Sequence, residues 1–261
     1  MADPIRIVYS GPTATVVIDR PDVRNAFDTA TIAGLHQAFM ALTDDKNVRA
    51  VVLTGAGEAF CAGGDMNWMR NSVNLSVAEN LAEAEAMAAM FDAIWNFPKP
   101  LIARVNGAAI GGGAGLVACC DIAIAAETAR FGFGEVKIGI IPAVIGQYVV
   151  PKIGYGHARA LFVTGERFTA ERAFEIGLVH AVTPTDELDV TVSNILNRTL
   201  TSGPQAVAAT KSALNAIWYM ERDAARRYVI ELIADIRTGE EAQEGLQAFL
   251  AKRRPAWTKL G

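Results

Sequence analysis

Two glycine-rich stretches and one glutamate are the residues of this chain that could do chemistry together. One stretch is Gly63-Gly64 and the other is Gly111-Gly112-Gly113, and each lies between an apolar run and a segment with helical features. Glycine destabilises the interior of a helix or strand, so both clusters need a reason. One reason is close approach of a ligand oxygen to bare N–H groups at a helix N-terminus, and the other is tight packing of backbone segments.

The two glycine turns can form an oxyanion hole if they converge in space. One N–H group from each turn would then bind the same oxygen, and no side chain would be required. Glu135 lies downstream in a glycine-rich segment among apolar residues. Its carboxyl group is either paired with Lys137 or Arg130, or is a general base whose pKa is raised by burial.

A dinucleotide-binding interpretation of these glycines is not supported. That fingerprint requires a third glycine at a fixed distance after the first two. Phe60 stands at that place after Gly55-Ala56-Gly57, and Leu116 stands there after the glycine triplet. We therefore expect no nicotinamide cofactor, and we expect no cofactor of another kind.

Metal and nucleophile chemistry also lack their usual spacing. The histidines are isolated from one another, and the adjacent cysteines at 119 and 120 cannot both bind one ion comfortably, so no metal site is expected. The chain contains no G-x-S-x-G sequence of a serine hydrolase. Cys61 has no histidine near it in sequence and is interpreted as a small buried residue. The three histidines are His36, His157 and His180.

The bulk composition is that of a globular chain with no nucleic-acid or membrane signature. It has 261 residues, of which 51% are hydrophobic and 20% charged, and its net charge is −4. That charge gives no argument for a nucleic-acid partner, and no uncharged run reaches the ~20 residues of a membrane span. No signal peptide is predicted at the N-terminus. Three cysteines, two of them adjacent, indicate free thiols in a reducing compartment, so we expect a cytoplasmic location.

Basic residues gather near the end of this otherwise acidic chain. Such a tail is either a solvated end or a contact for an anionic ligand. The residues are Lys252, Arg253, Arg254 and Lys259.

Strand and helix patterns alternate up to about residue 185, and helical patterns alone follow. This order is typical of an α/β sheet with crossover helices, followed by an all-helical appendage. Asp65 is the expected cap of a short helix, and Ser76 that of a helix over 76–96 whose methionine and aromatic stripe is interpreted as core. Strands are predicted at 5–9, 14–19, 48–54, 101–105, 121–126 and 178–182, and further helices at 29–42, 142–150, 155–164, 169–175, 186–200, 204–217, 221–236 and 239–251.

Taken together, these pieces resemble the crotonase, or enoyl-CoA hydratase/isomerase, superfamily. The resemblance covers essentially the whole chain, and it is specific because many short segments match in order and spacing. The matching segments are 21–26 (PDVRNA), 59–66 (AFCAGGDM), 99–109, 111–113, 120–123 (CDIA), 131–132, Glu135, 139–142 (GIIP) and the tail 244–255.

The resemblance implies a fold and an assembly. The implied fold class is α/β, a spiral of β-β-α turns, with C-terminal helices that mediate trimers, often paired into hexamers. We accordingly expect a spiral core over 1–197 and a helical oligomerisation region over 198–261. The implied substrate is a coenzyme A thioester.

The resemblance also assigns site residues by motif match. The N–H groups of Gly64 and Gly112 are expected to bind the thioester oxygen, and Glu135 is the expected catalytic acid/base. Segment 64–67 would lie along the acyl-CoA, and Ala62 would meet the adenine. Arg24 and Lys252 would approach the phosphates, and Lys252 could do so across a subunit boundary. The implied CoA-binding set is Arg24, Ala26, Ala62, Gly64, Asp65, Met66, Asn67, Gly112 and Lys252.

The chain departs from the family pattern at Gly115. In hydratases with two catalytic carboxylates, the first lies two residues after the glycine triplet, where this chain has Gly115, and the second matches Glu135. One carboxylate beside an oxyanion hole suffices to move a proton between two carbons, which is an isomerase reaction. Hydration by one carboxylate requires that a single water serves both carbons, or that the substrate brings its own carboxylate. The absent side chain is also expected to open space for a branched or bulky acyl group.

A second segment favours a hydratase over an isomerase. Residues 135–150 resemble the methylglutaconyl-CoA and isohexenylglutaconyl-CoA hydratase branch, in which Pro-Ala-x-Ile replaces Pro-Gly-x-Gly and glycine replaces the first glutamate. We therefore expect a lyase that adds or removes water at the 2,3-double bond of a branched or carboxylated enoyl-CoA. A Δ3–Δ2 enoyl-CoA isomerase and a non-catalytic acyl-CoA-binding protein stay open as alternatives. The expected partners are acyl-CoA and further copies of the chain.

Overall fold

The apolar runs of the sequence build a six-stranded sheet at the centre of the molecule. A computed structural model describes residues 3–258. β1 and β2 form the predicted antiparallel hairpin, and every later neighbour in the sheet pairs in parallel. In sheet order the strands are β1 (Ile5–Ser10), β2 (Thr13–Ile18), β3 (Ala50–Gly55), β4 (Leu101–Val105), β6 (Ile122–Ala126) and β9 (Ala181–Thr183).

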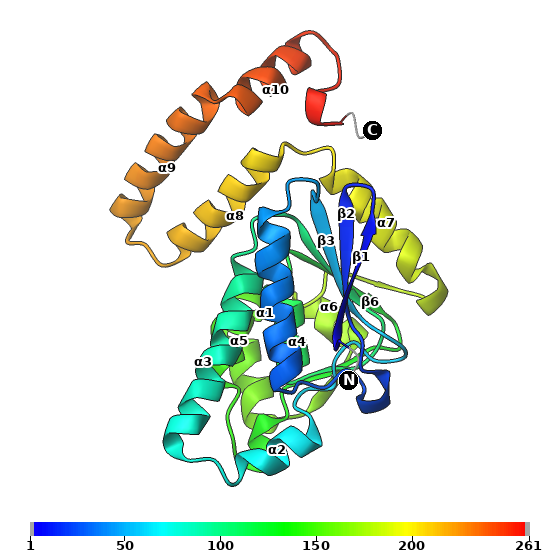
Figure 1. Cartoon of the computed structure of the whole chain (residues 1–261). Helices are drawn as coiled ribbons and strands as arrows, with labels where there is room; N and C mark the ends of the chain where they lie inside the picture. The colour runs from blue at the N-terminus through cyan, green and yellow to red at the C-terminus, as the bar shows by residue number, and fades with distance from the viewer. Residues whose placement is uncertain (1–2, 259–261) are drawn as a thin grey trace.

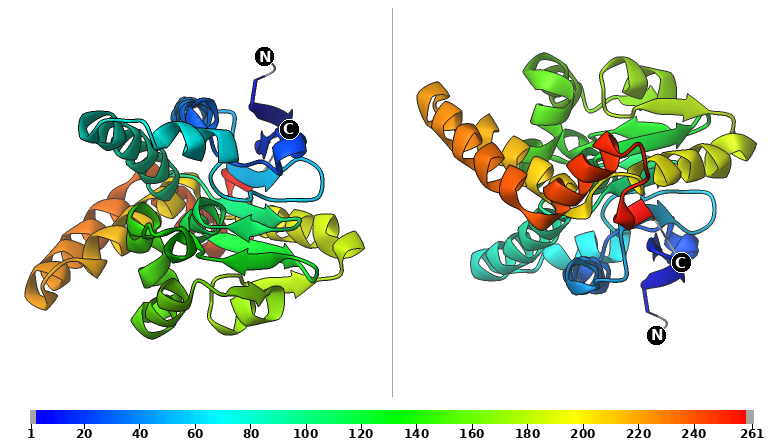
Figure 2. Two further views of the ribbon diagram at one scale, coloured as in Figure 1. Left: turned by 90° about the horizontal axis from the view of Figure 1, so that it is seen from below. Right: turned by 90° about the horizontal axis from the view of Figure 1, so that it is seen from above.

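Helices cover both faces of this sheet (Figures 1 and 2). Successive residues of β3 point to opposite faces, so Val51 and Leu53 enter the large core while Val52 enters a smaller cluster on the other side. α7 covers that smaller cluster through Leu188 and Val192. The helices are α1 (Thr29–Asp44), α2 (Met66–Ser72), α3 (Val77–Trp95), α4 (Gly112–Cys119), α5 (Ala143–Thr164), α6 (Ala170–Glu175), α7 (Leu188–Thr199), α8 (Pro204–Trp218), α9 (Arg222–Thr238) and α10 (Glu240–Leu250).

Polar caps begin α2 and α3, the two helices that lie in the chain between the glycine turns. Asp65 caps α2 by accepting hydrogen bonds from two backbone N–H groups of its first turn. Ser76 and Glu79 form a reciprocal capping box at the start of α3. Both caps confirm the predictions from the sequence, and the apolar stripe of α3 is core as expected, with Met90, Phe91 and Ile94 fully buried.

A second, three-stranded sheet lies beside the first and carries much of the site. Its strands, in order, are β5 (Ala109–Ile110), β7 (Arg130–Gly132) and β8 (Arg167–Thr169). No strand is predicted from the sequence at 109–110 or at 167–169, because segments of two or three residues carry no readable periodicity. β5 leads directly into α4, and β7 leads into the segment that holds Glu135.

Two further boundaries differ from the sequence prediction. The helices predicted on either side of residue 154 form one helix, α5, which is interrupted at Gly154 by a left-handed φ of 77°. The last strand begins at Ala181 rather than at residue 178, because the N–H groups of Leu178 and Val179 donate to the carbonyl of Ala173 and not to the sheet.

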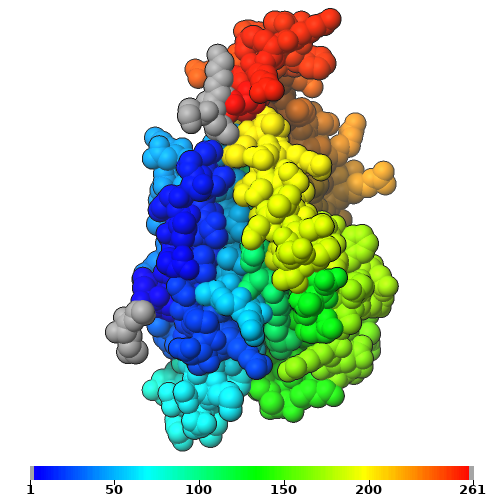
Figure 3. Space-filling model, turned by 90° about the vertical axis from the view of Figure 1, so that its right-hand side faces the viewer, coloured from blue at the N-terminus to red at the C-terminus, as the bar shows by residue number. Residues whose placement is uncertain are grey.

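The last three helices project away from the core (Figures 1 and 3). Neither α8 nor α9 contains a buried residue, although both carry large apolar side chains. Trp218 is 64% exposed and Phe249 of α10 is 80% exposed. Within residues 3–258, no helix combines the length and apolar character that a membrane crossing requires.

Candidate active site

The two glycine turns lie against one another, as the oxyanion-hole hypothesis requires. Cys61 N–H donates to the carbonyl of Ala108 at 2.9 Å, and Ile110 N–H donates to the carbonyl of Cys61 at 2.9 Å. A Cβ added to Gly113 would lie 2.2 Å from the Cys61 carbonyl oxygen, so no other residue fits there. The segments that end in Gly64 and Gly112 are therefore held side by side and open into one cavity.

The backbone around Gly64 is fixed on both sides by Phe27. Phe27 N–H donates to the carbonyl of Gly63, and Asp65 N–H donates to the carbonyl of Phe27, each at 2.7 Å. The N–H of Gly64 lies between these two bonds and donates to no partner within residues 3–258. It is a rigidly held donor, which is what stabilisation of a developing negative charge requires.

Gly112 is the first residue of α4, where an N–H group has no partner inside the helix. It too donates to no partner within the described chain. A Cβ added there would lie 2.5 Å from Cε2 of Phe27. Close packing and a free N–H are thus both present at Gly112. The packing explanation and the ligand-binding explanation of the glycine triplet are therefore compatible with one another.

Glu135 is the first residue of the 3-10 helix η2 (Glu135–Ile138), and its carboxyl group faces the glycine triplet. A Cβ added to Gly111 would lie 3.0 Å from Glu135 Oε1. Glu135 Oε2 is buried without a hydrogen-bond partner, and no ion pair joins Glu135 to Lys137 or Arg130. Burial raises the pKa of Glu135, and its own backbone N–H lowers it by less. The salt-bridge interpretation is therefore wrong for the described residues, and the general-base interpretation stays a prediction.

A cavity of about 650 Å³ joins these groups. Its walls contain both glycine turns and Glu135, together with apolar side chains from α2, α3 and the start of α5. Its charged lining residues are Glu83, Glu135, Lys137 and Arg167. The volume and the mostly apolar walls suit a small acyl group.

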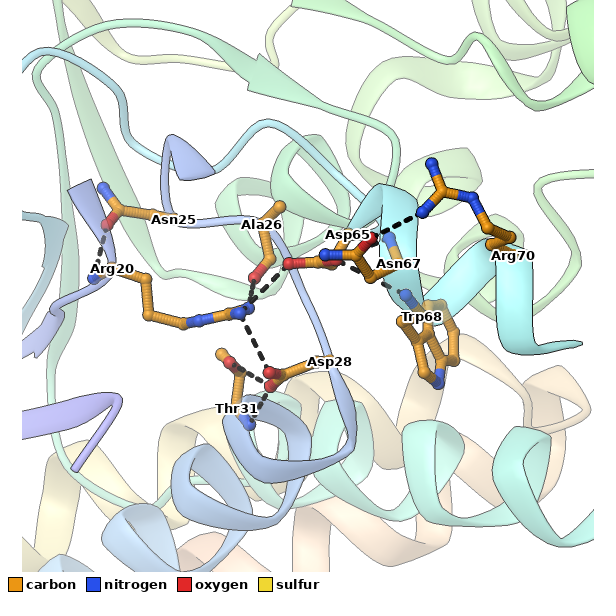
Figure 4. Close-up of polar contacts among 9 residues, drawn as sticks. All are labelled: Arg20, Asn25, Ala26, Asp28, Thr31, Asp65, Asn67, Trp68 and Arg70. Atoms are coloured by element: carbon orange, nitrogen blue, oxygen red, sulfur yellow. Dashed lines mark hydrogen bonds and ion pairs between the residues drawn. The ribbon is translucent and has the colours of Figure 1, made fainter. Parts of the chain in front are cut away.

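Arg20 holds the loop that carries Gly64, a role that the sequence analysis missed (Figure 4). Its Nη2 lies 3.0 Å from Asp65 Oδ2 and 3.0 Å from Asp28 Oδ2, and its Nη1 donates to the carbonyl of Ala26. Burial opposes charge on Asp65, but the two backbone N–H donors and Arg20 lower its pKa overall. The side chain of Asp65 is therefore occupied in holding α2, and only its backbone can meet a ligand.

The structure corrects the expectation that Gly115 opens space. A Cβ added to Gly115 would lie 2.4 Å from Ile145 Cγ2 and 3.1 Å from Phe91 Cε1. Gly115 is buried, and the place of the absent carboxylate is filled by the core. A larger acyl group gains no room from this substitution.

The remaining predicted CoA contacts fall into two groups. Ala62 N–H donates to the carbonyl of Arg24 at 3.0 Å, and Ala26 is buried, but none of these three residues lines the cavity. Lys252 follows α10, and Figure 1 shows this part of the chain at the opposite end of the molecule from α2. The basic residue Lys259 lies outside the described residues. Met66 and Asn67 are exposed on the first turn of α2.

The other candidate residues of the sequence are structural. Cys61 is fully buried, and burial raises the pKa of its thiol to about 12. His180 Nδ1 accepts the N–H of Ala123 and lies against the sheet. No cluster of residues suited to hold a metal ion occurs within residues 3–258.

A family model described as "Enoyl-CoA hydratase/isomerase" matches residues 10–260 of the chain. The crotonyl-CoA hydratase of Syntrophomonas wolfei is 35% identical over 243 residues, which are 92% of this chain and 92% of that protein. The short-chain-enoyl-CoA hydratase of Clostridium acetobutylicum is 34% identical over 246 residues, covering 94% and 93%.

Solved structures agree with the sequence comparisons. The crystal structure of an enoyl-CoA hydratase from Shewanella pealeana superposes with a TM-score of 0.94 at 38% identity. The superposition covers 97% of this chain and 96% of that chain. The α/β architecture predicted from the sequence is confirmed.

Proposed function

Because the chain belongs to the enoyl-CoA hydratase/isomerase family, we propose that it is a hydro-lyase acting at the 2,3-double bond of an enoyl-CoA. The two relatives that are named as hydratases support a hydratase over an isomerase. One observation carries it: Oε2 of Glu135 is buried without a hydrogen-bond partner, and the cavity that Glu135 lines is also lined by Gly64 and Gly112, whose backbone N–H groups are free within the described residues.

The geometry supports a reaction through a thioester enolate. The thioester oxygen accepts hydrogen bonds from Gly64 and Gly112, which stabilise the negative charge that develops on it. Glu135 delivers a proton to Cα during hydration and removes it during dehydration. The raised pKa of Glu135 keeps a larger fraction of its carboxyl group protonated near neutral pH than an exposed glutamate would have.

We propose further that the acyl group carries a carboxylate. Lys137 and Arg167 both line the cavity, and neither has an ion-pair partner within residues 3–258. Two unpaired cations at one wall suit an anionic acyl substituent. Position 115 gives no room for a branched acyl group, because Ile145 fills the space there, so the branched part of the proposal rests on the resemblance of residues 135–150 to the methylglutaconyl-CoA branch. The assignment to the methylglutaconyl-CoA branch stays a proposal.

We propose that the helices after about residue 198 associate with further copies of the chain, as a trimer or a hexamer. Their exposed apolar side chains, among them Trp218 and Phe249, support an interface. Assembly would also allow Lys252 of one copy to approach the CoA phosphates of another, because α10, which Lys252 follows, lies at the opposite end of the chain's fold from α2 (Figure 1).

A substrate panel tests the proposal. The purified protein is given crotonyl-CoA, 3-methylglutaconyl-CoA and a 3-enoyl-CoA, and products are identified by mass spectrometry. A gain of one water, faster with 3-methylglutaconyl-CoA than with crotonyl-CoA, is the expected result. Migration of the double bond without water uptake would indicate an isomerase. Tight CoA binding without turnover would indicate a binding protein.

A further inference from the structure

The acyl cavity contains a second carboxylate, and it comes from a different element than the family pattern uses. Two of the residues that line the cavity are carboxylates, Glu135 and Glu83 of α3. The place two residues after the glycine triplet is closed, because Ile145 and Phe91 occupy it. A second acid/base at this site therefore has to come from another wall.

Trp68 fixes the position of Glu83. The Trp68 Nε1–H donates to Glu83 Oε1 at 3.1 Å, which ties α2 to α3. The opposite edge of the same indole reaches the oxyanion turn, since a Cβ added to Gly64 would lie 3.5 Å from Trp68 Cζ3. One indole ring thus separates the carboxylate of Glu83 from the backbone of Gly64.

Glu83 and Glu135 are placed in different surroundings. Both residues are partly exposed, but Glu135 Oε2 is buried without a partner, whereas Glu83 Oε1 accepts a hydrogen bond from Trp68. Paired carboxylates in unlike surroundings are the usual basis for dividing acid and base roles. No ion pair neutralises Glu83 within the described residues, so its carboxylate is available to a water in the cavity.

We propose that Glu83 is the second catalytic carboxylate of this hydratase and takes the place of the glutamate absent at position 115. This inference rests on the proposed hydratase function. Glu83 accepts a proton from water while the water oxygen bonds to Cβ, and the π electrons of the double bond move into the thioester enolate. Glu135 then gives its proton to Cα as the enolate collapses. Water has been added, Glu83 ends protonated, Glu135 ends ionised, and both return to their starting states by exchange with solvent.

The test separates water addition from proton transfer at Cα. Two rates are measured for each protein. The first is the hydration of whichever enoyl-CoA of the substrate panel the wild type hydrates fastest, and the second is deuterium incorporation at Cα of butyryl-CoA in D2O. The exchange reaction needs only Glu135 and the oxyanion hole. Glu83→Gln keeps an oxygen that can accept the Trp68 N–H, so it removes the base without breaking that contact. Glu85→Gln, on an exposed position of the same helix, is the matched control.

Glu83→Gln is expected to lose about 10²-fold or more in hydration, the scale of a positioned acid/base, and to exchange at close to the wild-type rate. Glu135→Gln is expected to lose both activities, and Glu85→Gln neither. Trp68→Phe should lower hydration less than Glu83→Gln. Normal hydration by Glu83→Gln, equal losses of hydration and exchange, or an equal loss in Trp68→Phe would each overturn the proposal. A wild-type protein that exchanges but never adds water would instead overturn the proposed function.

Discussion

The side chain of Ile145 occupies the space that a side chain at position 115 would need. Its Cγ2 lies 2.4 Å from the Cβ that any residue larger than glycine would place there. Two departures of this sequence, the glycine after the triplet and the Pro-Ala-x-Ile segment, are therefore one packing arrangement. The space that the absent side chain would need is therefore filled by the core and is not open to a ligand.

This coupling predicts how position 115 responds to mutation. Gly115→Glu alone forces a side chain into Ile145 and Phe91 and should destabilise the fold by about 1–3 kcal/mol. Ile145→Gly alone should also destabilise it, because it leaves a cavity. The double variant should be more stable than the sum of the two losses, by about 0.5–3 kcal/mol. Urea unfolding of the four proteins measures this, and strictly additive losses would contradict the coupling.

Gly112 offers a direct test of the oxyanion hole. Gly112→Pro deletes the N–H at the first residue of α4, where a helix tolerates proline. Gly112→Ala keeps the N–H and introduces the same Cβ against Phe27. The proline variant should have a kcat about 10²–10³-fold below that of the alanine variant. Equal kcat values for two folded variants would remove Gly112 N–H from the mechanism.

The Arg20–Asp65 pair should contribute far more to stability than the exposed Arg6–Asp19 pair. Asp65 is buried, so Arg20→Met leaves its carboxylate without a cation, held only by two backbone N–H groups, and should cost up to about 3–5 kcal/mol. Arg6→Met should cost about 0–1 kcal/mol, because both of its groups are partly in solvent. The free energies of unfolding at pH 7 decide this, and similar values for the two variants would contradict it.

The Asp65 pair also has a defined pH dependence. The pKa of the Asp65 carboxyl group is lower in the folded protein than in the unfolded chain. The stabilisation that the ionised carboxylate contributes is therefore fully present above the ordinary pKa of aspartate, about 3.9, and is lost as the pH falls through the lower pKa of the folded state. The stability difference between wild type and Arg20→Met should therefore shrink on acidification. A difference that stays constant down to acid unfolding would contradict this assignment.

Glu135 should lower the stability of the protein at neutral pH. Burial raises its pKa, so the folded state binds its proton more tightly than the unfolded chain does. The resulting loss of stability begins as the pH rises through the ordinary glutamate value of about 4.3 and is complete above the folded pKa. Glu135→Gln should have a higher Tm than wild type at pH 8 and a smaller advantage at pH 4. A pH-independent Tm difference would argue against a raised pKa.

The sequence predicts the main sheet and most helices because long apolar runs and capping residues are local signals. The hairpin, the strand around Val51 and the Asp65 and Ser76 caps all follow from such signals. β5 and β8 are missed, because their two or three residues are strands only through pairing with distant segments. The boundary at Leu178 is missed for a related reason. Leu178 and Val179 are buried, but their N–H groups bond to Ala173 of α6 and not to the sheet.

The residues of the site also divide into those that carry a local sequence signal and those that do not. The two glycine turns and Glu135 are identified from their types and order, and the family resemblance selects Gly64 and Gly112 within the turns; all three residues line one cavity. Arg20, Glu83 and Trp68 are missed, because their contacts join residues 15 or 45 positions apart that no spacing rule connects. The error at Gly115 has the same source. A sequence shows that a side chain is absent, but only packing shows what fills its place.

The hydration rate of Glu135→Gln tests most directly whether Glu135 is the catalytic acid/base. The variant is compared with wild type for water addition to crotonyl-CoA and to 3-methylglutaconyl-CoA, and CoA affinity is measured in parallel by calorimetry. We predict that kcat falls by about 10²-fold or more while CoA affinity is unchanged, because Glu135 moves protons and does not hold the nucleotide. Turnover at the wild-type rate in a folded, CoA-binding variant would contradict the account.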